Sequence, residues 1–392
     1  MSQVTGALKS EQARTLGVMG GGQLGRMFVH AAQTMGYFTA VLDPDAHSPA
    51  GRVSHHHIQT AYTDPEGLQQ LATLSAAITT EFENVPAPAL RELALHRPVY
   101  PGADAVAIAQ DRAAEKAHFV KCGVPCAPYA VIDTSAQLEA TTEQNLLPGI
   151  LKTTRMGYDG KGQVRVKDAH ALRAAWQDLK QVSCVLEKML PLAIECSVIV
   201  ARGRDGQMVH FPVQRNLHRE GILAVTEVYE GHLPEALQAQ AIAAARAIAQ
   251  GVRYVGVLCV EFFVLQDGSL VVNEMAPRPH NSGHYTLDAC DQSQFELQVR
   301  TLAGLPLTTP RQHSAAVMLN LLGDIWFDAH NTPQEPDWAA VLALPGTHLH
   351  LYGKTEARKA RKMGHLNVTA ASAKEVCEVA LKAAAILGIE AF

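Results

Sequence analysis

The chain has 392 residues, 47% of them hydrophobic and 18% charged, which excludes an intrinsically disordered polymer. Its length predicts a large core that is divided between two or three domains. With 33 Lys and Arg residues against 38 Asp and Glu residues the net charge is −5, so no basic surface for nucleic acid or an anionic membrane is expected.

The N-terminal segment lacks the apolar core of a signal peptide, and no apolar run approaches the length of a membrane span. The seven cysteines include no Cys-x-x-Cys pair, which favours reduced, mostly packed thiols over a disulfide framework or a zinc site. We therefore expect a cytoplasmic protein with no membrane or nucleic-acid partner.

Residues 1–110 predict an N-terminal parallel sheet. Predicted strands and helices alternate in βαβ order, at 15–19, 26–35, 38–42, 65–74 and 76–81. The strands lack clean polar alternation, as expected where helices cover both faces of a sheet. We therefore assign these residues to an α/β domain of Rossmann-like type.

A glycine-rich loop, Gly20–Gly25, joins the first predicted strand to the first helix. It satisfies the G-x-G-x-x-G pattern, and Asp43 follows at the end of the second strand, as in dinucleotide-binding sites. The backbone N–H groups of such a loop can hold any phosphate. NAD binding, binding of another phosphate, and a turn needed only for packing are therefore three open interpretations.

A second region, residues 111–190, predicts a small α/β lid domain. A helix at 111–122 precedes strands around 151–152, 163–166 and 184–187. The loop between the first two of these strands contains three glycines and follows Lys152. Its backbone amides could close over phosphates to which Lys152 supplies a positive charge. Considered alone, such a loop is more often an ordinary exposed turn.

The third region, residues 191–392, predicts a C-terminal α+β domain. Its predicted strands and helices include those at 195–200, 234–250, 315–321, 348–352 and 373–387. Two further strands form a hairpin about the turn 266–268 and bring Glu261 beside Asn273 and Glu274. Two carboxylates and an amide offer the oxygen ligands that Mg²⁺ takes when it also holds polyphosphate. The alternative is a pair of strand-end acids that face solvent.

In combination these features resemble the ATP-grasp superfamily, through Lys152, the flap Tyr158-Asp159-Gly160-Lys161-Gly162-Gln163, Glu187-Lys188, Glu195, Glu261 and Asn273-Glu274. Further segments resemble one of its families, the 5-(carboxyamino)imidazole ribonucleotide synthases of purine biosynthesis, at 20–27, 80–85, 110–112, 278–284, 352–354 and 361–365. The match runs from about residue 15 to the C-terminus. The resemblance implies that ATP, bicarbonate and 5-aminoimidazole ribonucleotide react through carboxyphosphate to give the carboxylated ribonucleotide, ADP and phosphate. It also implies a homodimer formed away from the flap.

The resemblance implies a nucleotide site on the lid and hairpin. It assigns ATP binding to Arg112, Lys152, Gly157, Tyr158, Asp159, Gly160, Lys161, Gly162, Gln163, Glu187, Lys188, Met189, Leu190, Glu195, His218, Asn273 and Glu274. Within this set Lys152 contacts phosphate, 187–190 lies along the adenine, and Glu195 takes the ribose hydroxyls. One or two Mg²⁺ ions are expected on Glu261 and Glu274. Closure of the flap would keep carboxyphosphate and CO₂ from being lost to solvent.

Four residues are predicted to be catalytic, namely Arg278, His280, Asn281 and Asp159. Arg278 can make a forked contact with bicarbonate or carboxyphosphate. His280 and Asn281 can fix the acceptor or its leaving proton. Asp159 is the candidate base.

The acceptor ribonucleotide is assigned to Gln23, Leu24, Glu81, Tyr158, Ser282, Lys354, Arg361 and Lys362. Its monophosphate would rest on the loop at Gln23 and Leu24, with the three basic residues as its cationic partners. Of the nearby acids Glu81 and Glu83, we expect one to lie near the acceptor ribose and the other to be solvated.

Three alternatives remain open. An NAD-dependent oxidoreductase would explain the glycine loop and Asp43, but it would leave Lys152, the flap and the acidic hairpin without a role. A non-catalytic nucleotide-sensing protein could share the fold, although it would not need both metal carboxylates or Arg278. Another ATP-grasp ligase of purine synthesis is disfavoured by the segments 278–284 and 354–365, because function depends on the site and not on the fold.

Overall fold

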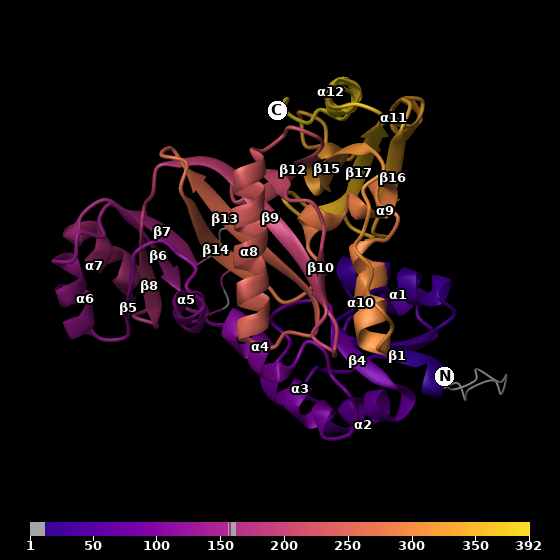
Figure 1. Cartoon of the computed structure of the whole chain (residues 1–392), viewed down its shortest axis with the longest axis horizontal. Helices are drawn as coiled ribbons and strands as arrows, with labels where there is room; N and C mark the ends of the chain where they lie inside the picture. The colour runs from indigo at the N-terminus through magenta and orange to yellow at the C-terminus, as the bar shows by residue number, and fades with distance from the viewer. Residues whose placement is uncertain (1–11, 156, 158–161) are drawn as a thin grey trace.

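The computed structural model describes residues 12–155, 157 and 162–392, and the chain is built on three β-sheets. Figure 1 shows the N-terminal sheet at the bottom, a small sheet at the left, and a large sheet that runs from the centre to the upper right. The proposed division at 1–110, 111–190 and 191–392 places one sheet in each part. The predicted flap residues Tyr158 to Lys161 lie outside the described residues.

The N-terminal sheet is parallel throughout and has the strand order β3-β2-β1-β4. Its elements are β1 (Thr15–Met19), α1 (Gln23–Thr34), β2 (Phe38–Leu42), β3 (His56–Ile58), α2 (Pro65–Leu74), β4 (Ala77–Thr80), α3 (Ala87–Ala94) and α4 (Ala103–Ala109). Helices α2, α3 and α4 pack on one face. The other face is covered by α1 and by α10 (Gln294–Ala303), which comes from the C-terminal part of the chain. The expected double coverage of the sheet is therefore confirmed.

Helix α1 begins at Gln23, three residues before the predicted start. Gly22 is extended and forms the N-cap, so the second half of the glycine loop is the first turn of the helix. The predicted strand 76–81 ends at Thr80, because Glu81 turns out of the sheet towards this helix start. The predicted elements 38–42 and 65–74 are confirmed at both ends.

The small sheet is antiparallel, with the order β5-β8-β6-β7, and two helices cover it. Its elements are β5 (Tyr129–Ile132), α6 (Ser135–Thr142), β6 (Gly149–Thr153), β7 (Gln163–Val166), α7 (Ala169–Asp178) and β8 (Cys184–Lys188). Lys152 pairs with Gln163, so the glycine loop joins two neighbouring strands, as predicted. Helix α5 (Arg112–Lys121) leads into this sheet, and Asp111 caps its first turn by accepting from two backbone N–H groups at 3.1 Å.

The large sheet has nine strands in the order β14-β13-β9-β11-β12-β15-β17-β16, with β10 paired to β9. The strands are β9 (Leu192–Arg202), β10 (Met208–His210), β11 (Gln214–Arg219), β12 (Ile222–Val228), β13 (Gly256–Leu265), β14 (Leu270–Ala276), β15 (Ala315–Leu322), β16 (Thr347–Leu351) and β17 (Lys362–Ala370). The helices of this part are α8 (Glu235–Gly251), α9 (Thr286–Ala289), α10, α11 (Trp338–Leu342) and α12 (Ala373–Leu387). The closing helix 373–387 is confirmed, whereas the predicted strand 348–352 is shifted by one residue.

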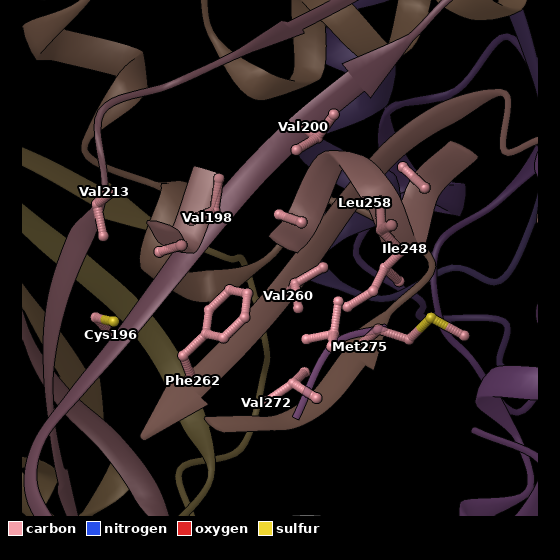
Figure 2. Close-up of a cluster of buried hydrophobic side chains, with 14 of the residues drawn as sticks. Cys196, Val198, Val200, Val213, Ile248, Leu258, Val260, Phe262, Val272 and Met275 are labelled. Atoms are coloured by element: carbon pink, nitrogen blue, oxygen red, sulfur yellow. The ribbon is translucent and has the colours of Figure 1, made fainter. Parts of the chain in front are cut away.

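Successive side chains of β13 point to opposite faces of the large sheet, so core residues and the site residue Glu261 lie on different faces. Leu258, Val260 and Phe262 point towards α8, where they pack with Val198 and Ile248 (Figure 2). Burying each such side chain contributes about 1.5–3 kcal/mol. The intervening residues of β13, Glu261 among them, therefore face the opposite side of the sheet.

The acidic hairpin is present as predicted, and it contains a bulge that was not predicted. Glu261 is paired with Glu274, but the next residue of β13 is paired with Val272, so Asn273 is an extra residue in β14. A bulge of this kind re-aims side chains beside an active site. It explains how the adjacent residues Asn273 and Glu274 can both serve one site.

All seven cysteines are free, as expected, and four of them are buried. Among the described residues no helix is long and apolar enough to cross a membrane.

Candidate active site

The candidate site lies where the hairpin β13–β14 meets α5 and the small sheet. Arg112, at the start of α5, places Nη1 3.3 Å from Oε2 of Glu274 and Nη2 3.3 Å from the carbonyl oxygen of Gly157. One guanidinium thus contacts both the hairpin and the beginning of the predicted flap. Burial lowers the pKa of Arg112, but the charges of Glu274, Glu115 and Glu187 together outweigh burial, and the net shift is upward.

The carboxylates of Glu261 and Glu274 stand directly opposite each other on neighbouring strands. Burial, and next the Glu274 charge, raise the pKa of Glu261 to about 7. Two acids held together in this way attract a cation, so the pair fits the Mg²⁺ that the resemblance implies. Within the described residues no group of three or more His, Cys, Asp or Glu side chains could hold a metal.

Lys152 lies in a buried three-residue ion cluster. Its Nζ is 3.1 Å from Oε2 of Glu187, and Nζ of Lys116 is 3.2 Å from Oε1 of the same carboxylate. Burial lowers the pKa of Lys152, whereas the two lysines hold the pKa of Glu187 below its usual range despite burial. Sequence patterns did not point to Lys116, although it follows Arg112 by one helical turn and so shares its face of α5.

Glu195 and His218 form an ion pair, and this pair lies on strands β9 and β11 of the large sheet. Burial lowers the pKa of His218, but the hydrogen bond to Glu195 and the Glu261 charge raise it overall. Lys188, another predicted nucleotide residue, ends β8, and Met189 and Leu190 follow the strand, with Met189 39% exposed. Gln163 begins β7, and Gly162 lies in the turn before it.

Glu115 of α5 is buried beside this site and was not predicted. Its Oε1 accepts the backbone N–H of Met275 at 2.7 Å, which fixes the strand next to Glu274. Burial, and next the Glu274 charge, raise the pKa of Glu115 to about 8.

We expect Glu115→Gln to change how stability depends on pH. The folded-state pKa of Glu115 lies above its unfolded value, so its stabilising contribution is complete below about pH 4 and is lost as the pH rises towards 8. The amide keeps the acceptor oxygen and has no charge to bury. The stability of the variant relative to wild type should therefore be greater at pH 8 than at pH 5 by on the order of 2–4 kcal/mol. Urea unfolding of the variant and of wild type at both pH values measures these stabilities. A stability difference between the two proteins that is the same at pH 5 and at pH 8 would contradict the prediction.

The glycine loop is held by two acids from neighbouring strands. Glu81 accepts the N–H groups of Gly22 and Gly25 at 2.8 and 3.1 Å, and Asp43 accepts that of Gly21 at 2.7 Å. Burial raises the pKa of Glu81. A Cβ at Gly22 would lie 2.5 Å from the Glu81 carboxylate, so the contact requires glycine.

The expectation that one of Glu81 and Glu83 would be solvated is wrong. Glu81 is buried under the glycine loop, and Glu83 forms an ion pair with Arg278. Burial raises the pKa of Glu83 and the Arg278 charge lowers it, with a net shift downward. Arg278 also donates from Nη1 to the carbonyl of Pro279 at 3.1 Å. The acid that was expected in solvent thus orients the predicted anion-binding arginine.

The basic residues near the C-terminus lie on the same side as the glycine loop. Lys354 donates to the carbonyl of Lys362 at 2.6 Å and is electrostatically coupled to Glu81, Arg361 and Lys362. Burial, and next the Arg361 charge, lower the pKa of Lys354 to about 8. A phosphate placed here would therefore meet a half-buried lysine whose charge it stabilises.

The segment after β14 carries the other predicted catalytic residues. His280 places Nε2 3.2 Å from Oε1 of Glu261, and Ser282 lies 2.9 Å from Nδ1 of the same ring. Burial, and next the Arg278 charge, lower the pKa of His280 well below its usual value. The Asn281 amide is buried with no partner for either polar atom among the described residues, as expected of a group that awaits a ligand.

Comparison with family models divides the chain into three matched segments. Residues 13–110 match the ribonucleotide synthetase preATP-grasp domain, 117–295 match the ATP-grasp domain, and 316–379 match the phosphoribosylaminoimidazole carboxylase C-terminal domain. The ATP-grasp fold with an N-terminal parallel sheet is therefore confirmed.

Individual relatives match almost end to end. An N5-carboxyaminoimidazole ribonucleotide synthase of Brucella melitensis is 44% identical, over 90% of this chain and 95% of the relative. A crystal structure of an N5-carboxyaminoimidazole ribonucleotide synthetase with ADP has a TM-score of 0.88 at 40% identity, over 96% of this chain and 97% of that one. An Aspergillus clavatus synthase crystallised with ADP and 5-aminoimidazole ribonucleotide has a TM-score of 0.86 at 30% identity, over 96% and 99%.

Proposed function

The chain belongs to the family of N5-carboxyaminoimidazole ribonucleotide synthases, and we infer that it is an ATP-dependent carbon–nitrogen ligase of purine biosynthesis. It carboxylates 5-aminoimidazole ribonucleotide with bicarbonate, through carboxyphosphate, and releases ADP and phosphate. One geometric observation supports this activity in particular. His280 joins the carboxylate pair of the nucleotide site to the loop of Arg278, so the two halves of the reaction share one face of the large sheet.

On the nucleotide side, Lys152 supplies positive charge to a phosphate of ATP. To reach the phosphate, Lys152 would turn away from Glu187. Lys116 makes this movement possible, because it stays paired with Glu187, so no buried carboxylate is left unpaired. Arg112 holds the flap base and Glu274 in one arrangement. Glu195 would take the ribose hydroxyls, and its ion-pair partner His218 would be a further ATP contact.

The metal requirement is a proposal that the carboxylate pair supports. Glu261 and Glu274 would hold one or two Mg²⁺ ions, which would neutralise the charge on phosphate oxygens during the transfer.

On the bicarbonate side, Arg278 is fixed by Glu83 through Nε, which leaves the outer edge of the guanidinium for an anion. Stabilising charge on bicarbonate and on carboxyphosphate is an electrostatic task that suits a preorganised donor. Asn281 follows Arg278 by three residues, and its buried amide, which has no partner among the described residues, would be a further contact for the bicarbonate anion.

The acceptor monophosphate fits the start of α1. Of the first backbone N–H groups of this helix, Glu81 takes those of Gly22 and Gly25, which leaves those of Gln23 and Leu24 for phosphate. Lys354 is a partly buried cation that interacts with Glu81 under this loop, and with Arg361 and Lys362. The assignment of Tyr158 and Asp159 to the acceptor remains a proposal outside the described residues.

NAD binding does not fit the glycine loop. Asp43, which would have to take the ribose hydroxyls of a dinucleotide, already accepts from Gly21 N–H at 2.7 Å and from the Tyr62 hydroxyl at 2.5 Å. A purely nucleotide-sensing role leaves the half-buried Arg278–Glu83 pair and the buried Asn281 amide without a purpose.

ADP release tests the proposed function. Purified protein with Mg-ATP and bicarbonate should form ADP rapidly only when 5-aminoimidazole ribonucleotide is added. ATP binding without stimulation by the ribonucleotide would contradict the proposed acceptor.

A homodimer and a cytoplasmic location are also proposed, from the family resemblance. Sedimentation equilibrium should give twice the mass of the chain, and a monomer at micromolar concentration would contradict the dimer.

A further inference from the structure

The segment from Gln110 to Arg112 lies where the N-terminal part of the chain meets the small sheet. Gln110 is the C-cap of α4, and Asp111 is the N-cap of α5. The backbone here is fixed, because the N–H groups of Gln110 and Asp111 donate to carbonyls of α4 at 2.9 and 3.2 Å, and that of Arg112 donates to the carbonyl of Thr154 at 2.9 Å. Of the three residues only Arg112 was predicted to serve the site.

The side chain of Gln110 holds the loop that carries Glu83. Its amide nitrogen donates to the carbonyl oxygens of Glu83 and Val85, each at 2.6 Å. A side-chain amide has two N–H groups, so both of them are used. The carboxylate of the same Glu83 pairs with Arg278, the proposed anion-binding residue. Gln110 therefore fixes the main chain of the residue that orients Arg278.

The two carboxylate oxygens of Asp111 have different partners. Oδ1 accepts two backbone N–H groups in the first turn of α5, each at 3.1 Å, and Oδ2 accepts Nε of Arg155 at 3.0 Å. Arg155 comes just after β6, the strand that carries Lys152. The carboxylate thus joins the helix start that carries Arg112 to the end of the strand that carries Lys152. Because Arg155 is 60% exposed, the ion pair contributes little stability, and what it supplies is geometry.

We propose that Gln110 and Asp111 are positioning residues for different halves of the reaction. Gln110 sets Arg278 for bicarbonate, by way of Glu83. Asp111 sets the two cations of the nucleotide site, Arg112 and Lys152, relative to each other. The inference rests on the proposed function for the assignment of the two substrates. It predicts that each substitution changes the KM of one substrate and not of the other, which a general structural role would not do.

Two substitutions remove these contacts with little change in size. Gln110→Met keeps the length of the side chain but has no N–H to donate. Asp111→Asn keeps an oxygen that can cap α5, but the position of Oδ2 becomes an amide nitrogen, which cannot accept from Arg155. Arg155→Met removes the same ion pair from its other end.

Two matched controls have the same chemistry elsewhere in the chain. Gln312→Met is the control for Gln110→Met, because Gln312 also donates to two backbone carbonyls, each at 2.8 Å. Asp168→Asn is the control for Asp111→Asn, because Asp168 caps α7 of the same small sheet. Both controls should stay within about twofold of wild type in every constant measured, as expected for substitutions away from the site.

The first readout is the initial rate with one substrate varied and the others saturating. Gln110→Met should raise the KM for bicarbonate about tenfold, the size expected for two lost hydrogen bonds, and leave the KM for ATP within about twofold. Asp111→Asn should raise the KM for ATP about three- to fivefold and leave the KM for bicarbonate unchanged. The double variant of Asp111→Asn with Arg155→Met should be no worse than either single variant, because one ion pair is lost in each case. Equal changes in both KM values, or a lower melting temperature with no change in KM, would overturn the proposal.

The second readout needs no turnover. In titration calorimetry Asp111→Asn should bind ADP about three- to fivefold more weakly, and Gln110→Met should bind it like wild type. In a crystal structure of Gln110→Met we expect the Arg278 guanidinium to have moved away from its position beside Glu83, and an unmoved guanidinium would overturn the proposal. If Gln110→Met does not fold, Gln110→Asn, whose amide is one methylene shorter, takes its place in both readouts. Failure of the ribonucleotide to stimulate ADP release would contradict the proposed function, whereas ADP affinity and the position of Arg278 would still test this inference.

Discussion

Glu274→Gln should abolish turnover while the fold stays intact. The substitution removes one of two opposed carboxylates without making a cavity, since the amide has the same shape. Loss of several kcal/mol of charge stabilisation at the phosphate corresponds to a decrease in kcat of about a thousandfold or more. ADP release at saturating ATP, bicarbonate and ribonucleotide measures this, and a variant with full ATPase activity would refute the metal assignment.

The matched control for this variant is Glu227→Gln. Glu227 also lies on a strand of the large sheet and pairs with an arginine, Arg215, at 3.2 Å, but it is on β12 and away from the hairpin. We expect its turnover to be close to wild type. The melting temperature of Glu274→Gln should change by only a few degrees, because relief of repulsion with Glu261 offsets the lost contact to Arg112.

The sequence was sufficient to predict the elements that carry the site. The turn 266–268 between two apolar runs predicted the hairpin, although its register alone would set Glu261 opposite Asn273 and the bulge brings Glu274 there instead. The glycine loop between a strand and a helix was equally clear, because helix and strand periodicities change on either side of it. Such local signals depend on neighbours in the chain, which a sequence shows directly.

These local signals could not predict contacts between residues that are far apart in the sequence. Glu83 and Arg278 are 195 residues apart, and tertiary packing, including that of α10 on the N-terminal sheet, brings their segments together. The bulge at Asn273 has no sequence marker, because no glycine stands there. Ser197 looks like an ordinary strand residue until register places it beside Glu261.

Arg278→Lys should lower kcat about 100- to 1,000-fold and raise the KM for bicarbonate, with the KM for ATP nearly unchanged. Lysine keeps the charge and can still meet Glu83, but it loses the planar fork that can hold Glu83 and an anion at once. Removing one preorganised donor to a developing oxyanion typically costs this much in kcat. Initial rates with bicarbonate varied at saturating ATP, and with ATP varied at saturating bicarbonate, separate the two effects.

Arg215→Lys serves as the control for Arg278→Lys, because Arg215 pairs with Glu227 on the same sheet at a more exposed position. An exposed pair of this kind contributes little, so neither KM should change. The guanidinium of Arg278, by contrast, is only 16% exposed, and the Glu83 charge raises its pKa despite desolvation, so the pair stays charged over the whole working range of pH. If the loss of kcat in Arg278→Lys became smaller as the pH is raised, this would contradict the assignment of Arg278 to the anion. A loss of kcat that does not change with pH is the result expected when the guanidinium fork is removed.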